Sequence, residues 1–109
     1  MAWLLREGEV LASVEIAETR AGRRRGLLGR DGLDGALLIR PCRSVHTFGM
    51  RFPIDVAFVD EELTVLRTVT LRPWRMTAPV RRARAVVEVE AGTFTRWGLE
   101  PGQQLELRA

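Results

Sequence analysis

The sequence is poor in several residue types, and each shortage excludes a class of protein. Its 109 residues include one cysteine, one histidine, no lysine and no tyrosine. A single cysteine cannot form a disulfide within the chain, so the fold does not depend on oxidation and suits a reducing compartment. No apolar run approaches the ~20 residues of a membrane-spanning helix. The start, Met1 to Glu7, also has no charged leader followed by a long apolar stretch. We therefore expect a cytoplasmic protein with no membrane partner.

Positive charge is carried by arginine alone. The 17 basic residues are all arginine, and with 14 acidic residues the formal net charge is +3. A guanidinium group stays charged and binds carboxylate or phosphate in a bidentate fork. The arginines concentrate in two stretches, 20–51 and 67–84, which could converge on one face and bind phosphate or nucleic acid. Few aromatic residues accompany them, chiefly Phe48, Phe52 and Trp74. A solvated surface is therefore the simpler interpretation, and nucleic acid is not an expected partner.

The pattern of apolar residues predicts one domain, residues 1–109, made mainly of strands. Alternation with a period of two predicts a hairpin over 2–17 around Glu7-Gly8-Glu9, with Val10, Ala12, Val14 and Ile16 on one face. Further strands are predicted over 36–39, 54–59, 63–72, 85–89 and 103–107. In the strand 63–72, one face is predicted to hold Leu63, Val65, Val69 and Leu71 together with Arg67. Short helices are predicted over 20–28, capped by Thr19, and 92–97, ended by Gly98. We expect an α+β fold, mainly β: a strongly bent antiparallel or mixed sheet, or a partly closed barrel, with two short helices.

Candidate site residues concentrate in the stretch from Cys42 to Asp60, where Asp55 stands inside an apolar run. A buried carboxylate must find hydrogen bonds or a cation, or take up a proton. The structural interpretation is that Asp55 accepts backbone N–H groups or the Thr47 hydroxyl and fixes the loop 43–52. The functional interpretation pairs Asp55, as orienter, with His46 as general base.

Cys42 allows two interpretations of its own. It could be a catalytic thiolate beside His46, activated by Arg40 and Arg43. A small buried apolar cysteine is the simpler alternative. Cys42, His46 and Asp55 together make a weak metal signal, because structural zinc uses four ligands. We expect no metal and no cofactor.

These observations favour a small soluble binding module over an enzyme. Its loops would form a cleft for a small or anionic ligand at one end of the sheet. A hydrolase that uses the His46 and Asp55 pair, with an arginine as anion stabiliser, is the alternative, and arginine-mediated nucleic-acid binding is a third. A monomer or a weak homodimer is expected. The residues predicted to bind the ligand are His46, Thr47, Met50, Asp55, Arg72 and Trp74.

Several segments also carry a resemblance to a known family. They are Ala17-Glu18-Thr19, Gly26-Leu27-Leu28, Cys42 to Met50, Pro53 to Asp60, Glu88 to Gly92 and Gly98 to Gly102. Over nearly its whole length the chain resembles an uncharacterised family, number 192 of the domains of unknown function. The resemblance implies a small β-rich, barrel-like domain with accessory helices, and it implies no established activity.

Overall fold

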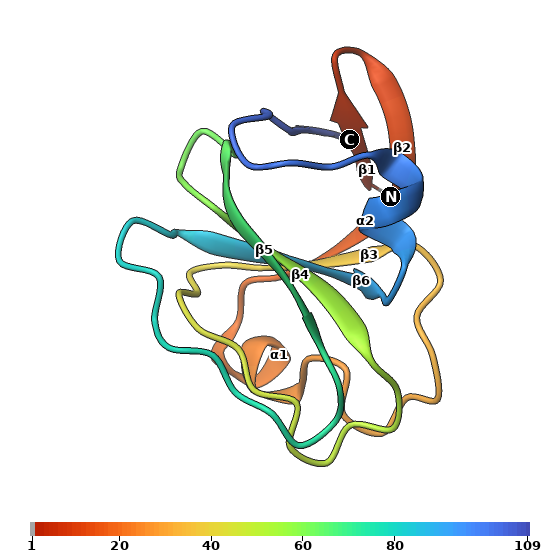
Figure 1. Ribbon diagram of the computed structural model, residues 1–109, viewed down its shortest axis with the longest axis vertical. Coiled ribbons are helices and arrows are strands. Elements are labelled where there is room, and N and C mark those ends of the chain that lie inside the picture. Colours follow the sequence, from red (N-terminus) through yellow and green to blue (C-terminus); the bar gives the residue numbers. More distant parts are fainter. Residues whose placement is uncertain (1) are drawn as a thin grey trace.

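The computed structural model describes residues 2–109 and contains one seven-stranded sheet with two short helices (Figure 1). The strands are β1 (Ala2–Arg6), β2 (Glu9–Ala17), β3 (Ala36–Ile39), β4 (Ile54–Val59), β5 (Val65–Leu71), β6 (Ala85–Glu90) and β7 (Glu106–Arg108), and the helices are α1 (Arg20–Arg25) and α2 (Thr93–Trp97). The predicted α+β, mainly β fold is confirmed. No helix within residues 2–109 is long and apolar enough to cross a membrane.

The sheet is mixed and strongly bent. Its strand order is β5-β4-β6-β3-β2-β1-β7, and every neighbouring pair is antiparallel except β2 with β3. The bend brings the two ends of this order together at a single bridge between Thr64 and Gln104. Beside it, Val65 N–H donates to the Gln103 carbonyl at 2.8 Å, and Leu105 N–H donates to the Leu63 carbonyl at 2.9 Å. The barrel is therefore approached but not closed.

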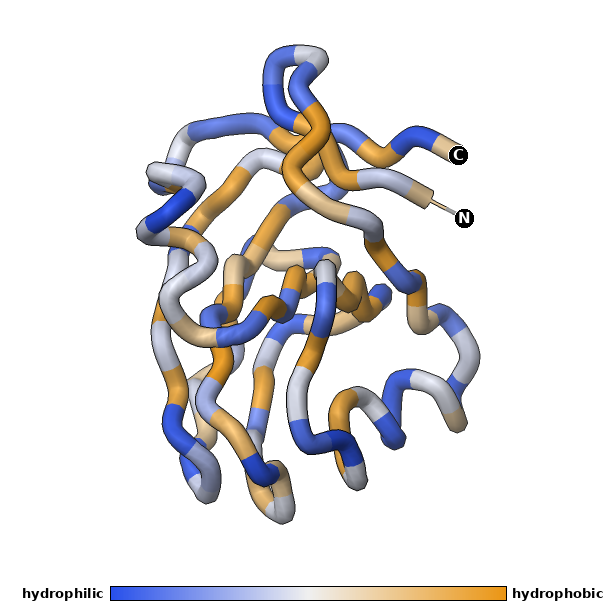
Figure 2. Tube along the Cα trace, turned by 90° about the vertical axis from the view of Figure 1, so that its right-hand side faces the viewer, coloured by the Kyte–Doolittle hydropathy of each residue, from blue (hydrophilic) through white to orange (hydrophobic). Residues whose placement is uncertain are grey.

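The central strands β3, β4 and β6 are buried on both faces, so their side chains alternate between two apolar clusters. One cluster includes Leu38, Ala57 and Val87 and is covered by Phe94 of α2. The other includes Leu37, Val56 and Val86 and is covered by residues of the loops 26–33, 40–53 and 72–84. Figure 1 shows these loops and α1 on the side of the sheet away from α2. Figure 2 shows the tip of the β1–β2 hairpin as a hydrophilic turn at one end of the molecule. Each fully buried aliphatic side chain contributes roughly 1.5–3 kcal/mol to folding.

Two β-bulges place some side chains on the opposite face of the sheet from the one that the sequence pattern predicts. The pairing of β1 with β2 moves from Leu4↔Ala12 to Leu5↔Val10, which leaves Leu11 as an extra residue. Val10 is consequently 54% exposed, while Leu11 packs against the first cluster. An extra residue reverses the alternation of side chains between the faces of a strand, which a sequence pattern with a strict period of two cannot represent.

The second bulge lies in β5, where the pairing moves from Phe58↔Arg67 to Val59↔Val65 and Leu66 is the extra residue. Val65 therefore belongs to the first cluster, whereas Leu71 belongs to the second. The prediction that Val65 and Leu71 share a face was wrong for the same reason as in β2.

The helix predicted over 20–28 is shorter than expected and ends at Arg25. Its predicted cap is confirmed, because Gly22 N–H donates to the Thr19 hydroxyl at 2.9 Å. Gly26 then adopts φ 46° and ψ −124°, which is not helical. The turn lets Leu27 enter the second cluster with 2% of its surface exposed, while no residue of α1 is buried. Burial of Leu27 thus outweighs continuation of a glycine-rich helix.

The second helix was predicted correctly at its C-terminal end. Helix α2 ends at Trp97, and its C-cap residue Gly98 has φ 62° and ψ 34° in the left-handed region. Glycine adopts this conformation without the steric penalty that a Cβ brings.

Candidate functional site

Two loops far apart in the sequence lie side by side beneath the sheet. Thr77 N–H donates to the Val45 carbonyl at 2.9 Å, Thr47 N–H to the Arg75 carbonyl at 2.8 Å, and Val80 N–H to the Arg43 carbonyl at 2.8 Å. An isolated antiparallel bridge pairs His46 with Met76 between these bonds. The loop segments 42–48 and 72–84, the paired loops, therefore run alongside each other, and the two arginine-rich stretches meet there.

Thr47 fixes this pairing from inside. Its side chain is fully buried, and its hydroxyl donates to the Arg72 carbonyl at 2.7 Å and accepts from Arg75 N–H at 2.9 Å. Its carbonyl accepts from Trp74 N–H at 3.0 Å and from Met50 N–H at 3.1 Å. One threonine thus satisfies backbone groups of both loops, as buried polar groups require.

Replacing Thr47 by valine is expected to lower the free energy of unfolding by roughly 2 kcal/mol, because the Arg75 N–H and the Arg72 carbonyl lose their partner while side-chain volume is kept. Hydrogen exchange should also become faster at the amides of residues 72–77. Denaturant unfolding with amide-resolved exchange measures both effects. Thr95→Val, at an exposed position in α2, is the matched control and should change the free energy by less than about 0.5 kcal/mol. Equal effects of the two variants would contradict the assigned role of Thr47.

Three aromatic rings form a row on the outside of the paired loops. The ring centroids of His46 and Phe48 are 5.1 Å apart with an interplanar angle of 26°, and those of Phe48 and Trp74 are 6.1 Å apart with an angle of 30°. The Nδ1 atom of His46 accepts a hydrogen bond from Phe48 N–H at 3.3 Å. Trp74 is 65% exposed and has φ 65°, a left-handed conformation that is uncommon for a bulky residue. The row is thus held by the loop backbone and faces solvent.

Asp55 lies on the other face of β4, with Ala57 and Val59 of the first cluster. It is 3% exposed and accepts three hydrogen bonds: from the Thr70 hydroxyl at 2.7 Å and from the N–H groups of Gly92 and Phe94 at 3.0 Å each. These donors connect β4 to β5 and to the start of α2. No hydrogen bond joins Asp55 to His46 or Thr47 within residues 2–109. The carboxylate therefore satisfies backbone donors, and the groups that it fixes are those of α2 and not the loop 43–52.

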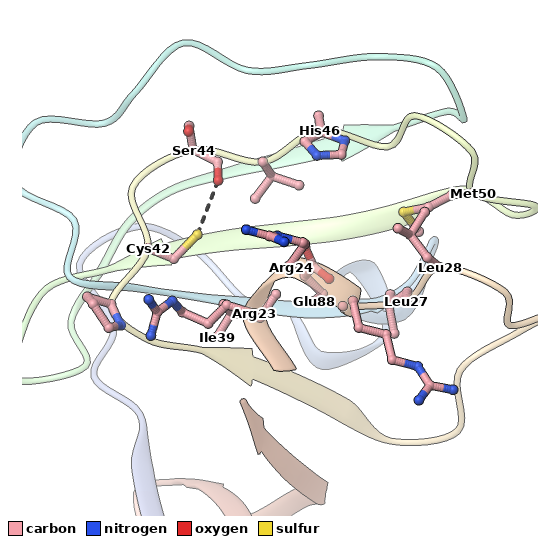
Figure 3. A pocket seen from close by; sticks show the side chains of 14 residues that line it. Arg23, Arg24, Leu27, Leu28, Ile39, Cys42, Ser44, His46, Met50 and Glu88 are labelled. Carbon is pink, nitrogen blue, oxygen red and sulfur yellow. Dashed lines mark hydrogen bonds between the residues drawn. The ribbon is translucent and has the colours of Figure 1, made fainter. Parts of the chain in front are cut away.

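A cavity of about 170 Å³ lies between α1 and the loop that follows β3 (Figure 3). Arg24 extends from α1 toward the middle of the lining residues, with Cys42 and Ser44 to one side of it and Met50 to the other. Both apolar and polar side chains line it. The lining residues are Arg23, Arg24, Arg25, Gly26, Leu27, Leu28, Ile39, Pro41, Cys42, Ser44, Val45, His46, Met50 and Glu88.

Glu88 is the most unusual group in this lining. It points to the same face of β6 as Val86, and its neighbours across the sheet are Leu37 and Val56. It is 4% exposed, and within residues 2–109 no donor hydrogen-bonds its carboxyl group and no arginine nitrogen lies within 4 Å of it. Burial alone raises the pKa of Glu88 from its ordinary 4.5 to about 7. At neutral pH this side chain therefore exists as both a proton donor and an anion, with only the cavity beside it.

Cys42 is held as a thiol. Burial raises the pKa of Cys42, and the charge of Glu88 raises it further, while the backbone of Ser44 and the charge of Arg23 oppose the shift with smaller effects. The sulfur donates to the Ser44 carbonyl at 3.1 Å (Figure 3). A reactive thiolate requires the opposite direction of shift. The nearby charge also comes from Arg23, whereas the sequence had suggested Arg40 and Arg43.

The structure thus distributes the six predicted ligand-binding residues over three places. Thr47, Arg72 and Trp74 belong to the paired loops, Met50 lines the cavity, and His46 belongs to both, while Asp55 lies at the N-terminus of α2. Within residues 2–109 no three histidine, cysteine or acidic side chains gather closely enough to hold a metal ion.

Sequence reasoning missed Glu88, although the signal was available. Glu88 interrupts the apolar run Ala85-Val86-Val87-Glu88-Val89 just as Asp55 interrupts its own strand. The two carboxyl groups differ only in what surrounds them: Asp55 has three donors and Glu88 has none among the described residues. This difference depends on tertiary contacts.

Known proteins are similar to this chain in sequence over most of its length. The model of the family DUF192, described as "Uncharacterized ACR", matches residues 3–107. A UPF0127 protein of Pyrococcus abyssi is 35% identical over 98 residues, covering 85% of this chain and 84% of the relative. A UPF0127 protein of Pyrococcus furiosus is 31% identical over 103 residues, covering 90% of this chain and 89% of the relative.

Two crystal structures resemble this one closely. A protein of unknown function from Novosphingobium aromaticivorans has a TM-score of 0.81 at 23% identity, covering 96% of this chain and 82% of its own. A protein from Sinorhizobium meliloti, provisionally described as a transcription regulator, has a TM-score of 0.79 at 24% identity, covering 96% and 90%. At these identities the likeness concerns the fold.

Proposed function

Since this chain belongs to the DUF192 family, which is described as uncharacterised, we propose a function from its own cavity: it is a binding module for a small organic acid. The observation that carries this proposal is the buried Glu88 carboxyl group, which has no protein donor and opens into a cavity lined by three consecutive arginines.

The charges around the cavity support an acidic ligand. Arg23, Arg24 and Arg25 line it from α1, and neither Arg24 nor Arg25 has a carboxylate within 4 Å among the described residues. Guanidinium groups bind carboxylates through charge-assisted hydrogen bonds. Protonated Glu88 adds a donor at the floor, since a neutral carboxyl group carries one O–H. Ionised Glu88 would instead repel the ligand.

The size and the lining of the cavity favour an acidic ligand whose remaining part is small and apolar. Leu27, Ile39, Val45 and Met50 supply apolar surface. The volume of about 170 Å³ is close to that of an engineered apolar cavity of about 150 Å³ that accepts benzene. We therefore expect ligands of the size of benzoate. The single thiol of Cys42 suits a reducing compartment, so a cytoplasmic location is part of the proposal.

Benzoate is the probe that tests this function. Binding followed by NMR titration should be roughly 10-fold tighter at about pH 6 than at about pH 8, because the protonated fraction of a carboxyl group with a pKa of about 7 falls by that factor. Shift changes should centre on Leu27, Cys42 and Met50. In Glu88→Gln the dependence on pH should disappear, since glutamine does not titrate.

Three controls accompany this titration. Glu90→Gln changes an exposed glutamate on the same strand and should keep the dependence on pH. Arg24→Gln should weaken benzoate binding roughly 10-fold, as expected for the loss of a hydrogen bond to a charged group. Benzamide, the uncharged analogue, should bind less tightly than benzoate at pH 6. The proposal is refuted if the affinity for benzoate changes neither with pH nor with the Glu88→Gln substitution.

A further inference from the structure

The aromatic row His46, Phe48 and Trp74, together with Met76, forms an exposed surface that shares only His46 with the cavity lining. Phe48 is 41% exposed, Trp74 65% and Met76 67%. Large apolar side chains that gather on the outside of a protein in this way mark binding sites. The His46 and Phe48 rings are stacked with centroids 5.1 Å apart, and the Trp74 ring lies 6.1 Å from Phe48 with a tilt of 30°. We call this set the aromatic surface.

The two segments that hold the aromatic surface are rich in arginine and contain no acidic residue. The segments 40–54 and 72–87, which hold all four of its residues, contain eight arginines and no aspartate or glutamate. Arg40 pairs with Glu18 and Arg51 with Asp31; the remaining six, Arg43, Arg72, Arg75, Arg81, Arg82 and Arg84, have no carboxylate within 4 Å in the part of the chain described. All six are exposed. The formal net charge of the whole chain is only +3, so positive charge is concentrated on these paired loops.

The backbone fixes the aromatic surface in advance of binding. Trp74 N–H donates to the Thr47 carbonyl at 3.0 Å, and the next residue, Arg75, donates its N–H to the Thr47 hydroxyl at 2.9 Å. The bridge between His46 and Met76 joins two further members. A surface held in this way loses little conformational freedom when a ligand binds.

We propose that the aromatic surface and its arginines bind single-stranded nucleic acid. Exposed bases would stack on Trp74 and Phe48, and phosphates would contact arginines such as Arg72 and Arg75, the combination by which proteins bind single strands without sequence preference. An acidic peptide would satisfy the arginines and leave the row of rings unused. A duplex would satisfy them too, but its stacked bases are closed to the rings. The charge and the rings together therefore favour a single strand over either alternative.

Fluorescence anisotropy with labelled oligothymidylate of about 12 nucleotides tests this inference. The association constant should fall between about 50 and 200 mM salt, with a slope of roughly −0.7 on logarithmic axes for each phosphate contact. Trp74→Asn should weaken binding roughly 10-fold through the loss of stacking. Asparagine is chosen because it tolerates the left-handed backbone at this position. Trp3→Asn changes a tryptophan that is 40% exposed on β1 and should leave binding unchanged.

The arginines are tested with a second matched pair. Arg75→Gln should reduce the magnitude of the salt slope by about 0.7, whereas Arg96→Gln, in α2, should not alter it. Polyglutamate should compete poorly with the oligonucleotide, and a duplex of the same length should bind more weakly than the single strand. The proposal is overturned if Trp74→Asn binds as the wild type does. It is equally overturned if polyglutamate or the duplex matches the single strand, or if no binding occurs at the lower salt concentration.

Discussion

Replacing Asp55 by alanine is expected to lower the free energy of unfolding by roughly 3–5 kcal/mol, since the breaking of a buried network belongs to the few mechanisms with effects this large. The substitution leaves the N–H groups of Gly92 and Phe94 and the Thr70 hydroxyl without the acceptor that each has at 3.0 Å or less. It also removes the side-chain acceptor of the N–H groups of Gly92 and Phe94 at the start of α2, where Gly92, the N-cap residue, supplies no side-chain cap. Urea unfolding at neutral pH measures the loss.

Asp55→Asn separates the hydrogen bonds of this group from its charge. One oxygen of Asp55 accepts from both N–H groups, and the other accepts from the Thr70 hydroxyl. An asparagine can keep the first pair with its carbonyl and donate its amide to Thr70, because a hydroxyl both donates and accepts. We expect a loss of about 1–2 kcal/mol, much smaller than for alanine.

The control for this pair is Asp31→Ala, which removes an aspartate whose side chain is 86% exposed and paired with Arg51. Its effect should stay below about 1 kcal/mol, as is usual for surface ion pairs. A loss equally small for Asp55→Ala would show that the three hydrogen bonds do not hold α2 to the sheet.

Replacing Glu88 by glutamine is expected to change how stability depends on pH, by up to about 3 kcal/mol between pH 5 and 8. The folded pKa of Glu88 is about 7, above its ordinary 4.5. Between these values the folded protein holds a proton that the unfolded chain has released, so stability falls as pH rises through this window. Above pH 7 the full cost of burying the anion is present. Glutamine cannot ionise, so the variant should gain stability relative to the wild type as pH rises.

Unfolding free energies of the wild type and Glu88→Gln at about pH 5 and pH 8 measure this effect. Glutamine also carries a fixed cost, because its amide is buried without a protein partner. The informative quantity is therefore the difference in unfolding free energy between Glu88→Gln and the wild type, compared at pH 5 and at pH 8. Glu90→Gln, exposed on the same strand, should show no such change. A constant difference for Glu88→Gln would mean that its carboxyl group is not desolvated, whereas a failure of benzoate binding alone would leave this result intact.

Local elements of the fold were predictable because their signals are local. The hairpin around Glu7-Gly8-Glu9, the cap by Thr19 and the left-handed Gly98 each follow from a few neighbouring residues. The bulges at Leu11 and Leu66 were not predictable, since each depends on the partner strand. A bulge places two residues opposite one, and only the pairing reveals where this happens.

For the candidate site, too, the residue types were predictable from the sequence and their contacts were not. Its residue types were recognisable because the chain has one histidine, one cysteine and a carboxylate, Asp55, inside an apolar run. The sheet decides which of these residues meet. Glu88 of β6 pairs with Val56 of β4, and neighbouring residues of a strand point to opposite faces. Asp55 therefore faces α2, whereas Glu88 faces the cavity beside Cys42.

The sequence by itself determined the fold class, the predominance of strands and the concentration of arginine and unusual side chains around residues 40–60 and 72–84. Only the tertiary structure decided that these two segments run alongside each other, that Thr47 joins them, and that Glu88 is a buried carboxyl group without a protein donor among the described residues. The physical reason is that periodicity and capping act over a few residues. Desolvation and hydrogen bonding of a buried group depend on neighbours brought from distant parts of the chain.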